Sequence, residues 1–292
     1  MAPKQKQFQH LGWGRSSNGA LGLLDSEEER ELRPQPVVQA SPAPGLLCDE
    51  AVLNLCCGAN FTLLLTIHGN IWSCVANEHG QLGYSSVGKT CAKPRRVLAG
   101  CSIIKLACGS SHAAAISAES NLYMWGLNSS GQLGLGHKRA LNPMSAQIVP
   151  HLKWCGEPKA LSQDGLKGHR KNSAAAKDCG VVGWQEVACG GSHTIGAFLA
   201  EPGARLIIAS WGQGEAGCLG LGDTDDRESP TVIDICAQLD IVQIACGLRH
   251  TVLLTRDQSV YTFGFTEDGR LGLPFLRRGT PRGGLLHSHT TE

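Results

Sequence analysis

The sequence predicts an all-β fold built from repeated, short antiparallel strands. Glycine accounts for 37 of the 292 residues, which is well above its usual share of about 7%. Hydrophobic residues nevertheless make up 42% of the chain, enough for a packed core. The glycines follow no three-residue period and apolar residues are plentiful, so collagen-like and disordered classes are excluded. A chain with a core and this much glycine is expected to contain many tight turns joining short strands.

Short β-rich runs alternate with turn residues along the chain. Residues 103–109 and 241–247 are apolar runs that end in glycine, and residues 251–255 and 259–263 follow the second run closely. These spacings predict strand, turn and strand, with no room for intervening helices. Because the runs are nearly continuous in apolar residues, the strands are expected to be buried on both faces.

A first repeated motif consists of an aromatic residue, a polar spacer and then Gly-x-Leu-Gly, with the last glycine nine residues after the first position. Its turn glycines are predicted to adopt a positive φ or to allow close backbone approach. The aromatic residues Trp125 and Trp211, and Gly131, Gly134, Gly217 and Gly220, are therefore assigned as structural repeat positions. The five copies are Trp13–Gly22, Cys74–Gly83, Trp125–Gly134, Trp211–Gly220 and Phe263–Gly272.

A second motif, Cys-Gly-x-x-His, precedes four of these segments. Its copies begin 51, 81 and 57 residues apart, and Phe61 replaces the histidine in the first copy. The glycines are predicted to lie within strands that are packed closely together. They are Gly58, Gly109, Gly190 and Gly247, and the three histidines are His112, His193 and His250.

Both motifs and the 51-residue spacing resemble the repeat of the regulator of chromosome condensation family, over about residues 11 to 275. The resemblance implies a β-propeller of repeated four-stranded blades, which in this family numbers seven. Seven such blades need roughly 360 residues, whereas the sequence contains four complete units and a half unit at the start. About four to five blades are therefore expected, as an incomplete ring, a piece of a longer product or a smaller closed ring.

The predicted organisation has one repeat domain with two tails and one insertion. Residues 1–10 are expected to be a flexible N-terminus, and residues 11–275 form the propeller repeats. A polar insertion at about 153–180 accounts for the longest interval between repeats. Residues 276–292 are rich in Arg, Gly and His without a strand pattern, so a disordered tail is expected there.

Charge and cysteine content narrow the cellular context. The formal net charge of +1 gives no long-range field that would gather nucleic acid or an anionic membrane. No apolar run is long enough to span a membrane, and no signal peptide pattern opens the sequence. The 13 cysteines are scattered without CxxC pairs, as in reduced proteins. A cytoplasmic or nuclear protein is expected.

The three box histidines could suggest metal binding or acid–base chemistry. Each one, however, occupies the same position of its own repeat, far in sequence from the others. A structural histidine is the better interpretation, with its ring nitrogens bonded to backbone groups of the neighbouring turn. The box cysteines are interpreted as small buried hydrophobic residues, and a zinc site is not expected without closely spaced ligands.

Catalytic and nucleotide-binding patterns are absent from the sequence. There is no G-x-S-x-G, no H-E-x-x-H and no complete P-loop. Gly212, Gly214 and Gly217 match G-x-G-x-x-G, but no helical pattern follows them, so a dinucleotide site is not expected. Neither a catalytic site nor a cofactor is predicted.

Loops that follow the Gly-x-Leu-Gly turns are the candidate partner-binding surface, since propellers recruit partners with loops on one rim. The polar insertion is a second candidate, against the alternative of a flexible surface loop. The candidate residues are His137, Lys138 and Arg139, then His169, Arg170 and Lys171 in the insertion, and finally Asp223, Asp225, Asp226 and Arg227.

Three functions remain open from the sequence. A non-enzymatic scaffold that binds partner proteins through rim loops agrees best with the fold and with the lack of catalytic clusters. The family resemblance also implies a guanine-nucleotide exchange factor for a small Ran-like GTPase, with the insertion as a wedge. The third hypothesis is a repeat segment of a larger regulator such as a ubiquitin ligase.

Overall fold

The computed structural model describes residues 11–15, 30–36, 50–84, 90–141, 145–150, 183–199, 203–272 and 286–288. Within them the chain forms four four-stranded antiparallel sheets and one two-stranded sheet. Helical structure in the described residues is confined to three short 3-10 segments, η2 (Glu215–Gly217), η3 (Asp234–Gln238) and η4 (Glu267–Gly269). The prediction of an all-β fold made of four-stranded blades is thereby confirmed.

Each four-stranded sheet is one blade, numbered 1 to 4 in chain order, with its strands joined to their sequence neighbours. Blade 1 consists of β3 (Val52–Cys57), β4 (Phe61–Thr66), β5 (Ile71–Ala76) and β6 (Thr90–Val97). Blade 2 consists of β7 (Ile103–Cys108), β8 (His112–Ser117), β9 (Leu122–Gly126) and β10 (Gln147–Ile148). Blade 3 consists of β11 (Trp184–Cys189), β12 (His193–Leu199), β13 (Leu206–Gly212) and β14 (Arg227–Val232). Blade 4 consists of β15 (Ile241–Cys246), β16 (His250–Thr255), β17 (Val260–Gly264) and β18 (Leu286–Ser288).

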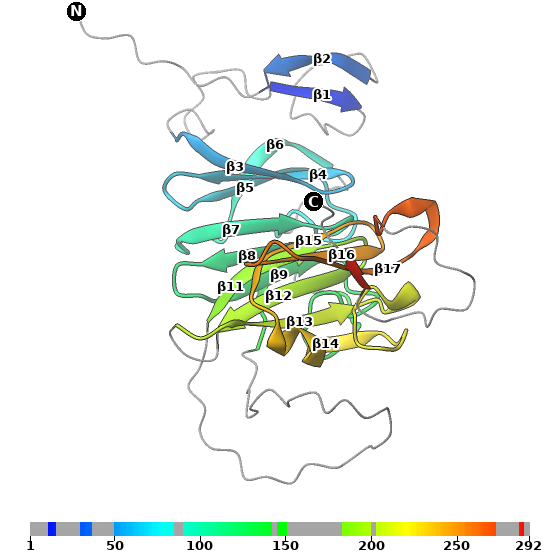
Figure 1. The fold of residues 1–292 in the computed structure, drawn as a ribbon. Helices are drawn as coiled ribbons and strands as arrows, with labels where there is room; N and C mark the ends of the chain where they lie inside the picture. The colour runs from blue at the N-terminus through cyan, green and yellow to red at the C-terminus, as the bar shows by residue number, and fades with distance from the viewer. Residues whose placement is uncertain are drawn as a thin grey trace, which may run out of the picture.

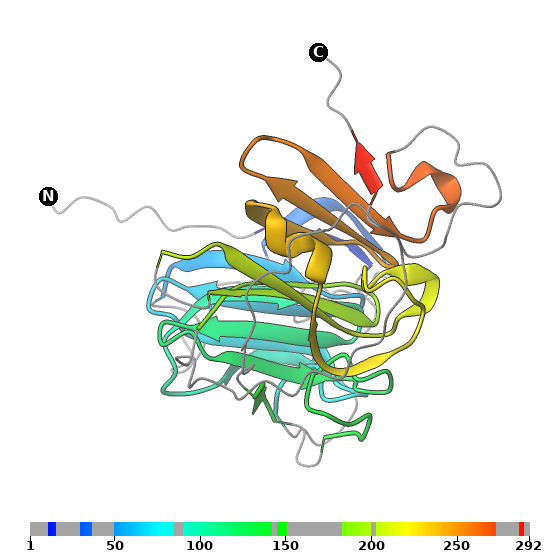
Figure 2. The same cartoon turned by 60° about the horizontal axis from the view of Figure 1, so that its bottom comes forward.

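The blades pack face to face in chain order. Figure 1 shows blades 1, 2 and 3 stacked from top to bottom, and Figure 2 separates blade 4, in orange, from them. The first strands of neighbouring blades lie side by side, as β3 with β7, β7 with β11 and β11 with β15. The Cys-Gly box follows each first strand, so all four boxes lie at the same end of these strands, side by side in neighbouring blades.

Apolar side chains fill the space between neighbouring blades. Phe61 and Trp125 belong to the cluster between blades 1 and 2, Trp211 to the cluster between blades 2 and 3, and Phe263 to the cluster between blades 3 and 4. Every residue of β8 is buried, because this strand has a blade on each of its two faces. Burial on both faces explains why the sequence of such strands is continuously apolar.

The same β-bulge occurs in all four blades, between the first and the second strand. The register shifts after Val52, Ile103, Trp184 and Ile241, the first paired residue of each first strand. A bulge places two residues of one strand opposite one residue of the other and so reverses which face the following residues occupy. The side chains before and after the bulge of each first strand therefore do not follow one alternating pattern of faces, and a strict alternation of residues would not predict this.

The half unit at the start of the sequence forms a hairpin of β1 (Leu11–Arg15) and β2 (Arg30–Pro36). It lies beyond blade 1 in Figure 1. Residues 1–10 and the insertion at 153–180 lie outside the described residues. Of the tail at 276–292, only β18 is described, and these three residues pair with Val260, Tyr261 and Thr262 of β17. Over those residues a fourth strand replaces the expected disorder.

No helix among the described residues is long and apolar enough to cross a membrane.

Candidate interaction surface

Three of the four box glycines, Gly58, Gly109 and Gly190, touch the box glycine of the next blade. A Cβ at Gly58 would lie 2.7 Å from the Gly109 carbonyl oxygen, and a Cβ at Gly190 would lie 2.8 Å from the Gly247 carbonyl oxygen. At Gly109, a Cβ would collide with the Gly190 carbonyl oxygen and the His112 ring. These glycines follow the first strand directly and do not lie within it, which corrects the mid-strand placement. Glycine is required here because the Phe or His ring of the same box lies against it and, at Gly58, Gly109 and Gly190, so does a carbonyl oxygen of the next blade.

Two of the three box histidines, His112 and His193, reach across to the next blade. His112 Nε2 lies 3.0 Å from Thr194 Oγ1, and His193 Nε2 lies 3.2 Å from Thr251 Oγ1. The Nε2 partner is thus a hydroxyl of the second strand in the following blade, whereas the sequence predicted backbone groups of the neighbouring turn. The threonines were missed by sequence reasoning because they lie 82 and 58 residues from their histidines.

The hydrogen-bond directions fix the tautomer of these histidines. Thr194 Oγ1 donates to the Gln132 carbonyl oxygen at 2.9 Å, so its lone pair accepts the proton of His112 Nε2. Thr251 Oγ1 likewise donates to the Cys218 carbonyl oxygen at 3.0 Å. A histidine beside a hydroxyl could activate a nucleophile, but here the histidine donates and the hydroxyl proton is already engaged. His112, Thr194 and Thr251 are also fully buried, so no substrate reaches these pairs.

Burial keeps the box histidines neutral. Burial, with the nearby His193 ring, lowers the pKa of His112 to about 3, and burial with the nearby His250 ring lowers the pKa of His193 to about 4. Burial also lowers the pKa of His250, where Arg270 contributes. A group with such a pKa is uncharged near pH 7, as a hydrogen-bonded interior imidazole should be.

The interface between blades 1 and 2 uses an apolar version of the same contact. Phe61 occupies the histidine position of blade 1, and Ala113 of blade 2 occupies the position of Thr194 and Thr251. Both residues are buried in the same cluster. The polar ring and the polar hydroxyl are thus absent together at this interface, which shows that the position packs blades together and needs no ionisable group.

In blades 1, 2 and 3 the Gly-x-Leu-Gly turn packs on the aromatic residue of the next blade. Trp125 Nε1 donates to the Gln81 carbonyl oxygen at 2.9 Å, and Trp211 Nε1 donates to the Gln132 carbonyl oxygen at 3.0 Å. A Cβ at Gly134 would lie 2.9 Å from Trp211 Nε1, so glycine at the end of the turn leaves room for the indole. The turn glycines adopt positive φ, with values of 79° at Gly131, 69° at Gly134, 74° at Gly217 and 68° at Gly220.

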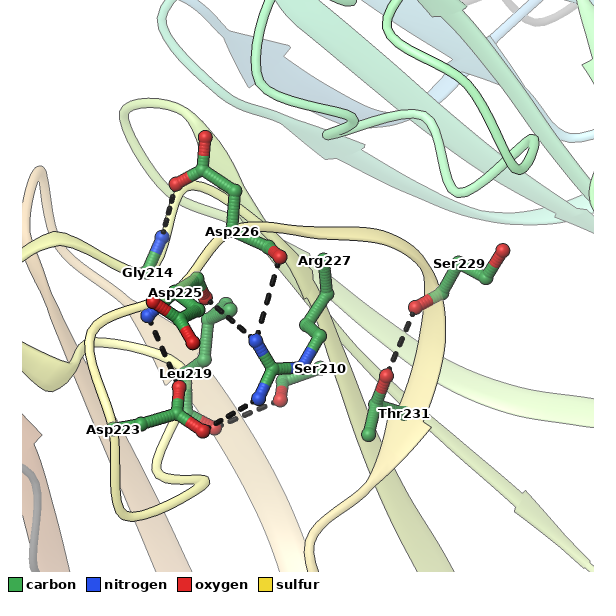
Figure 3. A network of polar contacts seen from close by, with 9 residues as sticks. All are labelled: Ser210, Gly214, Leu219, Asp223, Asp225, Asp226, Arg227, Ser229 and Thr231. Carbon is green, nitrogen blue, oxygen red and sulfur yellow. Dashed lines mark hydrogen bonds and ion pairs between the residues drawn. The ribbon is translucent and has the colours of Figure 1, made fainter.

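The loop after the Gly-x-Leu-Gly turn of blade 3 is held by its own polar groups (Figure 3). Arg227 Nη2 bonds Asp223 Oδ2 at 2.6 Å, and its Nη1 donates to the Asp225 carbonyl oxygen at 3.1 Å. Asp226 Oδ1 accepts the Gly214 amide at 2.9 Å. The charged residues predicted for this loop therefore lie together, and they fix the loop on the blade.

A contact between loops joins the rims of blades 2 and 3. Lys138 Nζ lies 2.8 Å from Asp226 Oδ2, with both side chains about one third exposed or more. This hydrogen bond raises the pKa of Lys138; for Asp226, burial opposes the charge, but the bonds from Lys138 and Gly214 outweigh it and its pKa is lowered. Beneath them, Asn128 Nδ2 donates to the carbonyl oxygens of His137 at 2.8 Å and Arg139 at 3.1 Å.

Asn128 was not assigned a structural role from the sequence, although Asn77 stands at the same position of the turn in blade 1. Both side-chain oxygens accept the amide of the turn leucine, at 3.0 Å for Asn77 and 3.1 Å for Asn128. The recurrence of Asn at this position is the signal that could have revealed it. His169, Arg170 and Lys171 lie outside the described residues. Among the described residues, no group of three His, Cys, Asp or Glu side chains could hold a metal ion.

Comparison with known proteins gives a consistent relationship. The family model of the RCC1-like domain matches residues 9–282. The ultraviolet-B receptor UVR8 of Arabidopsis thaliana is 30% identical over 89% of this chain and 50% of its own length. The probable E3 ubiquitin-protein ligase HERC3 of Homo sapiens is 32% identical over 90% of this chain and 26% of its own length. The chain thus spans half or less of these two relatives.

The fold agrees with a solved propeller. Yeast RCC1 (Prp20), in its crystal structure with Kap60, superimposes with a TM-score of 0.69 at 20% identity, over 97% of this chain and 59% of that one. The blades, the repeated motifs and the match of the family model along almost the whole sequence lead to one assignment. The chain belongs to the family of RCC1-like domains.

Proposed function

We propose that this chain is a non-enzymatic scaffold that binds partner proteins through the rim formed by the loops after its Gly-x-Leu-Gly turns. The observation that carries the proposal is the Lys138–Asp226 contact, which joins charged loops of two blades over a buried framework. Loops held in place before binding lose less conformational entropy when a partner binds.

The surface of this rim is charged and of mixed sign. Lys138, Arg139, Asp225 and Glu228 are exposed, so both signs lie within adjacent loops. Complementary charges steer a partner and select against wrong ones. Yeast RCC1, which has the same fold, is bound to the protein Kap60 in its structure, and this supports a protein partner here. A cytoplasmic or nuclear location remains part of the proposal.

The test compares two charge-reversal variants of the full chain. Lys138→Glu/Arg139→Glu alters the rim, whereas Arg256→Glu alters the turn between β16 and β17, at the opposite end of the strands. Proteins captured from one cell extract by each variant and by the unchanged chain are quantified by mass spectrometry. The rim variant is expected to lose most specific partners, with only a small drop in its thermal midpoint because an exposed ion pair such as Lys138–Asp226 contributes little to stability. The Arg256 variant, which also breaks an exposed ion pair, is expected to keep the partners. Equal capture by all three proteins contradicts the rim proposal.

An exchange-factor function is the second candidate, supported by the fold shared with yeast RCC1 and by the family resemblance. Such a factor binds the nucleotide-free GTPase more tightly than the loaded one, and this difference in affinity drives release. The measurement is release of fluorescent GDP from purified Ran-, Rab- and Arf-type GTPases at catalytic concentrations of the chain. Stimulated release establishes exchange activity, and no stimulation across the panel removes this candidate.

A role within a larger regulator is the third candidate. It is favoured by HERC3, a probable ubiquitin ligase of which the matching region covers 26%. Among the described residues, the His–Thr contacts supply no catalytic pair to such a protein. They are buried, and in each the histidine donates a proton to the hydroxyl oxygen, whereas a general base would accept one. In that case the chain would contribute recognition, by the same rim.

A further inference from the structure

Two cysteine side chains meet across the interface between blades 1 and 2. Successive residues of a strand point to opposite faces, so neighbouring positions of a first strand face different blades. Cys108, the box cysteine of blade 2, packs in the cluster with blade 1, and Cys56 of blade 1 packs in the same cluster. The thiols of Cys56 and Cys108 are hydrogen-bonded to each other. The interface therefore contains a pair of thiols in direct contact.

The pair is particular to this interface. The residue before the box cysteine is Cys56 in blade 1 and alanine in the other three blades, at Ala107, Ala188 and Ala245. At the interface between blades 3 and 4, Cys246 Sγ lies 3.7 Å from the Ala188 carbonyl oxygen, so a box cysteine reaches the residue that corresponds to Cys56 there too. Cys56 thus adds a second thiol to a contact that is formed elsewhere without one.

The backbone beside the two thiols is held close between the blades. A Cβ at Gly58 would lie 2.7 Å from the Gly109 carbonyl oxygen, and the Ala59 amide donates to the Ser110 carbonyl oxygen at 3.1 Å. A disulfide needs cysteine Cα atoms within about 7 Å of each other. Thiols already in contact, on strands fixed this closely, can be joined with little movement of either strand.

The two thiols differ in acidity. The hydrogen bond from the Cys108 thiol lowers the pKa of Cys56, although burial opposes this. Burial raises the pKa of Cys108, and the hydrogen bond to Cys56 adds to the rise. Because the thiolate is the reactive form, Cys56 is the nucleophile of the pair and Cys108 the second thiol. Both side chains are partly exposed, so a small oxidant can reach them.

We propose that Cys56 and Cys108 are a redox-sensitive pair, which a peroxide converts into a disulfide that joins blades 1 and 2. Of the three interfaces between the described blades, this one has Phe61 and Ala113 in place of a histidine–threonine pair. The disulfide adds a covalent link at the interface that lacks this polar contact. Disulfides of reducing compartments are typically transient and redox-sensing, as a reversible link of this kind would be.

The reaction takes place in two steps that balance. The Cys56 thiolate attacks one oxygen of hydrogen peroxide, so that an S–O bond forms, the O–O bond breaks and the released hydroxide takes up the proton lost by Cys56. Cys108 then loses its proton, and its sulfur attacks the Cys56 sulfenic acid. An S–S bond forms, the S–O bond breaks and the hydroxyl leaves with that proton as water. Two thiols are oxidised to one disulfide, and one peroxide is reduced to two waters.

Mild treatment of the full chain with hydrogen peroxide tests the proposal. Remaining thiols are blocked with N-ethylmaleimide, and unreduced tryptic peptides are mapped by mass spectrometry. Cys108 is the only cysteine in the tryptic peptide of residues 106–138, so its partner peptide is identified directly. A link to the peptide that contains Cys56 is expected, with a mass loss of about 2 Da that dithiothreitol reverses. The thermal midpoint should rise by about 5 °C.

Two variants identify the partner of Cys108. Cys56→Ala gives blade 1 the alanine of the other three blades, and it should lose both the link and the rise in thermal midpoint. Cys57→Ser removes the exposed thiol next to Cys56 and should keep both. A link to residues 106–138 that survives Cys56→Ala overturns the proposal, and so does an unlinked Cys108 in the oxidised unchanged chain. A link that leaves the thermal midpoint unchanged contradicts a role in joining the blades.

Discussion

The interface between blades 1 and 2 and the interface between blades 2 and 3 solve the same packing problem with different chemistry. The first places Phe61 near Ala113 in an apolar cluster. The second places His112 against Thr194, with the hydroxyl donating on to Gln132. Because an apolar pair takes the place of the polar pair at an equivalent interface of the same molecule, the polar pair has a structural role. The comparison therefore removes the box histidines from the list of catalytic candidates.

The same comparison shows what both interfaces keep. Box glycines touch the next blade at each of them, and the Trp125 and Trp211 indoles each donate to the carbonyl of the preceding turn. The backbone contacts are common to both interfaces, whereas the histidine position varies. We therefore expect the glycines to contribute most to stability, the buried histidines less, and a single indole bond least.

The largest effect is expected from Gly109→Ala. Its Cβ would collide with the Gly190 carbonyl oxygen and the His112 ring, and rigid overpacking of this kind costs about 3 kcal/mol or more. Gly100→Ala is the matched control, because Gly100 has a φ of 90° but no atom within 4 Å of its Cβ position, which predicts a loss of about 1 kcal/mol. Chemical denaturation measures both, and equal losses contradict steric contact between blades.

Lowering the pH is expected to destabilise the two interfaces that contain a histidine–threonine pair and to leave the apolar interface between blades 1 and 2 unaffected. The pKa of His112 is about 3 and that of His193 about 4 in the folded chain, against about 6.5 unfolded. Between these pH values the unfolded state therefore binds more protons than the folded state. The contribution of the histidines to the free energy of unfolding is full above about pH 6.5 and falls as the pH drops below it. From pH 7 to pH 5 the loss is about 2 kcal/mol per histidine. Denaturant titration at several pH values measures it.

A variant sharpens the pH prediction. His112→Phe combined with Thr194→Ala copies the apolar interface of blades 1 and 2 and should reduce the acid-dependent loss by roughly half. An unchanged pH dependence in this variant would show that other groups cause the loss.

The smallest effect is expected from Trp211→Phe. Phe263 stands at this position in blade 4, so a phenyl ring is compatible with the turn that packs on it. The bond to the Gln132 carbonyl oxygen is lost, although Thr194 still donates to that oxygen, and the fully buried side chain loses part of its packing beside Trp184. The two losses together should cost about 2 kcal/mol. Denaturant unfolding measures the change, and a loss as large as that of Gly109→Ala would contradict this ranking.

Much of the fold could be predicted because each complete repeat of the sequence corresponds to one blade. The two motifs located the four complete blades and the turns that end in Gly83, Gly134 and Gly220. The common bulge after Val52 and its equivalents could not be predicted, since it depends on pairing between strands. β18 was missed because its three residues have no strand pattern and are ordered by pairing with β17.

The candidate surface was predicted in part. The rim residues Lys138 and Asp226 were named separately, but their contact spans 88 residues and exists only because blades 2 and 3 are adjacent. The threonine partners were missed for the same reason, since a single threonine in a strand has no distinctive pattern. Local motifs can identify the position of a box, whereas its partner depends on how the blades stack.

The most direct test of the account is a double-mutant cycle at the second interface. The unfolding free energies of His112→Phe, Thr194→Ala and the double variant are measured at pH 7 by denaturant titration. If the two side chains act as one contact between blades, the double variant is more stable than the sum of the single losses predicts, with a coupling of about 1–3 kcal/mol. Additive losses would contradict the claim that these residues join the blades as a pair.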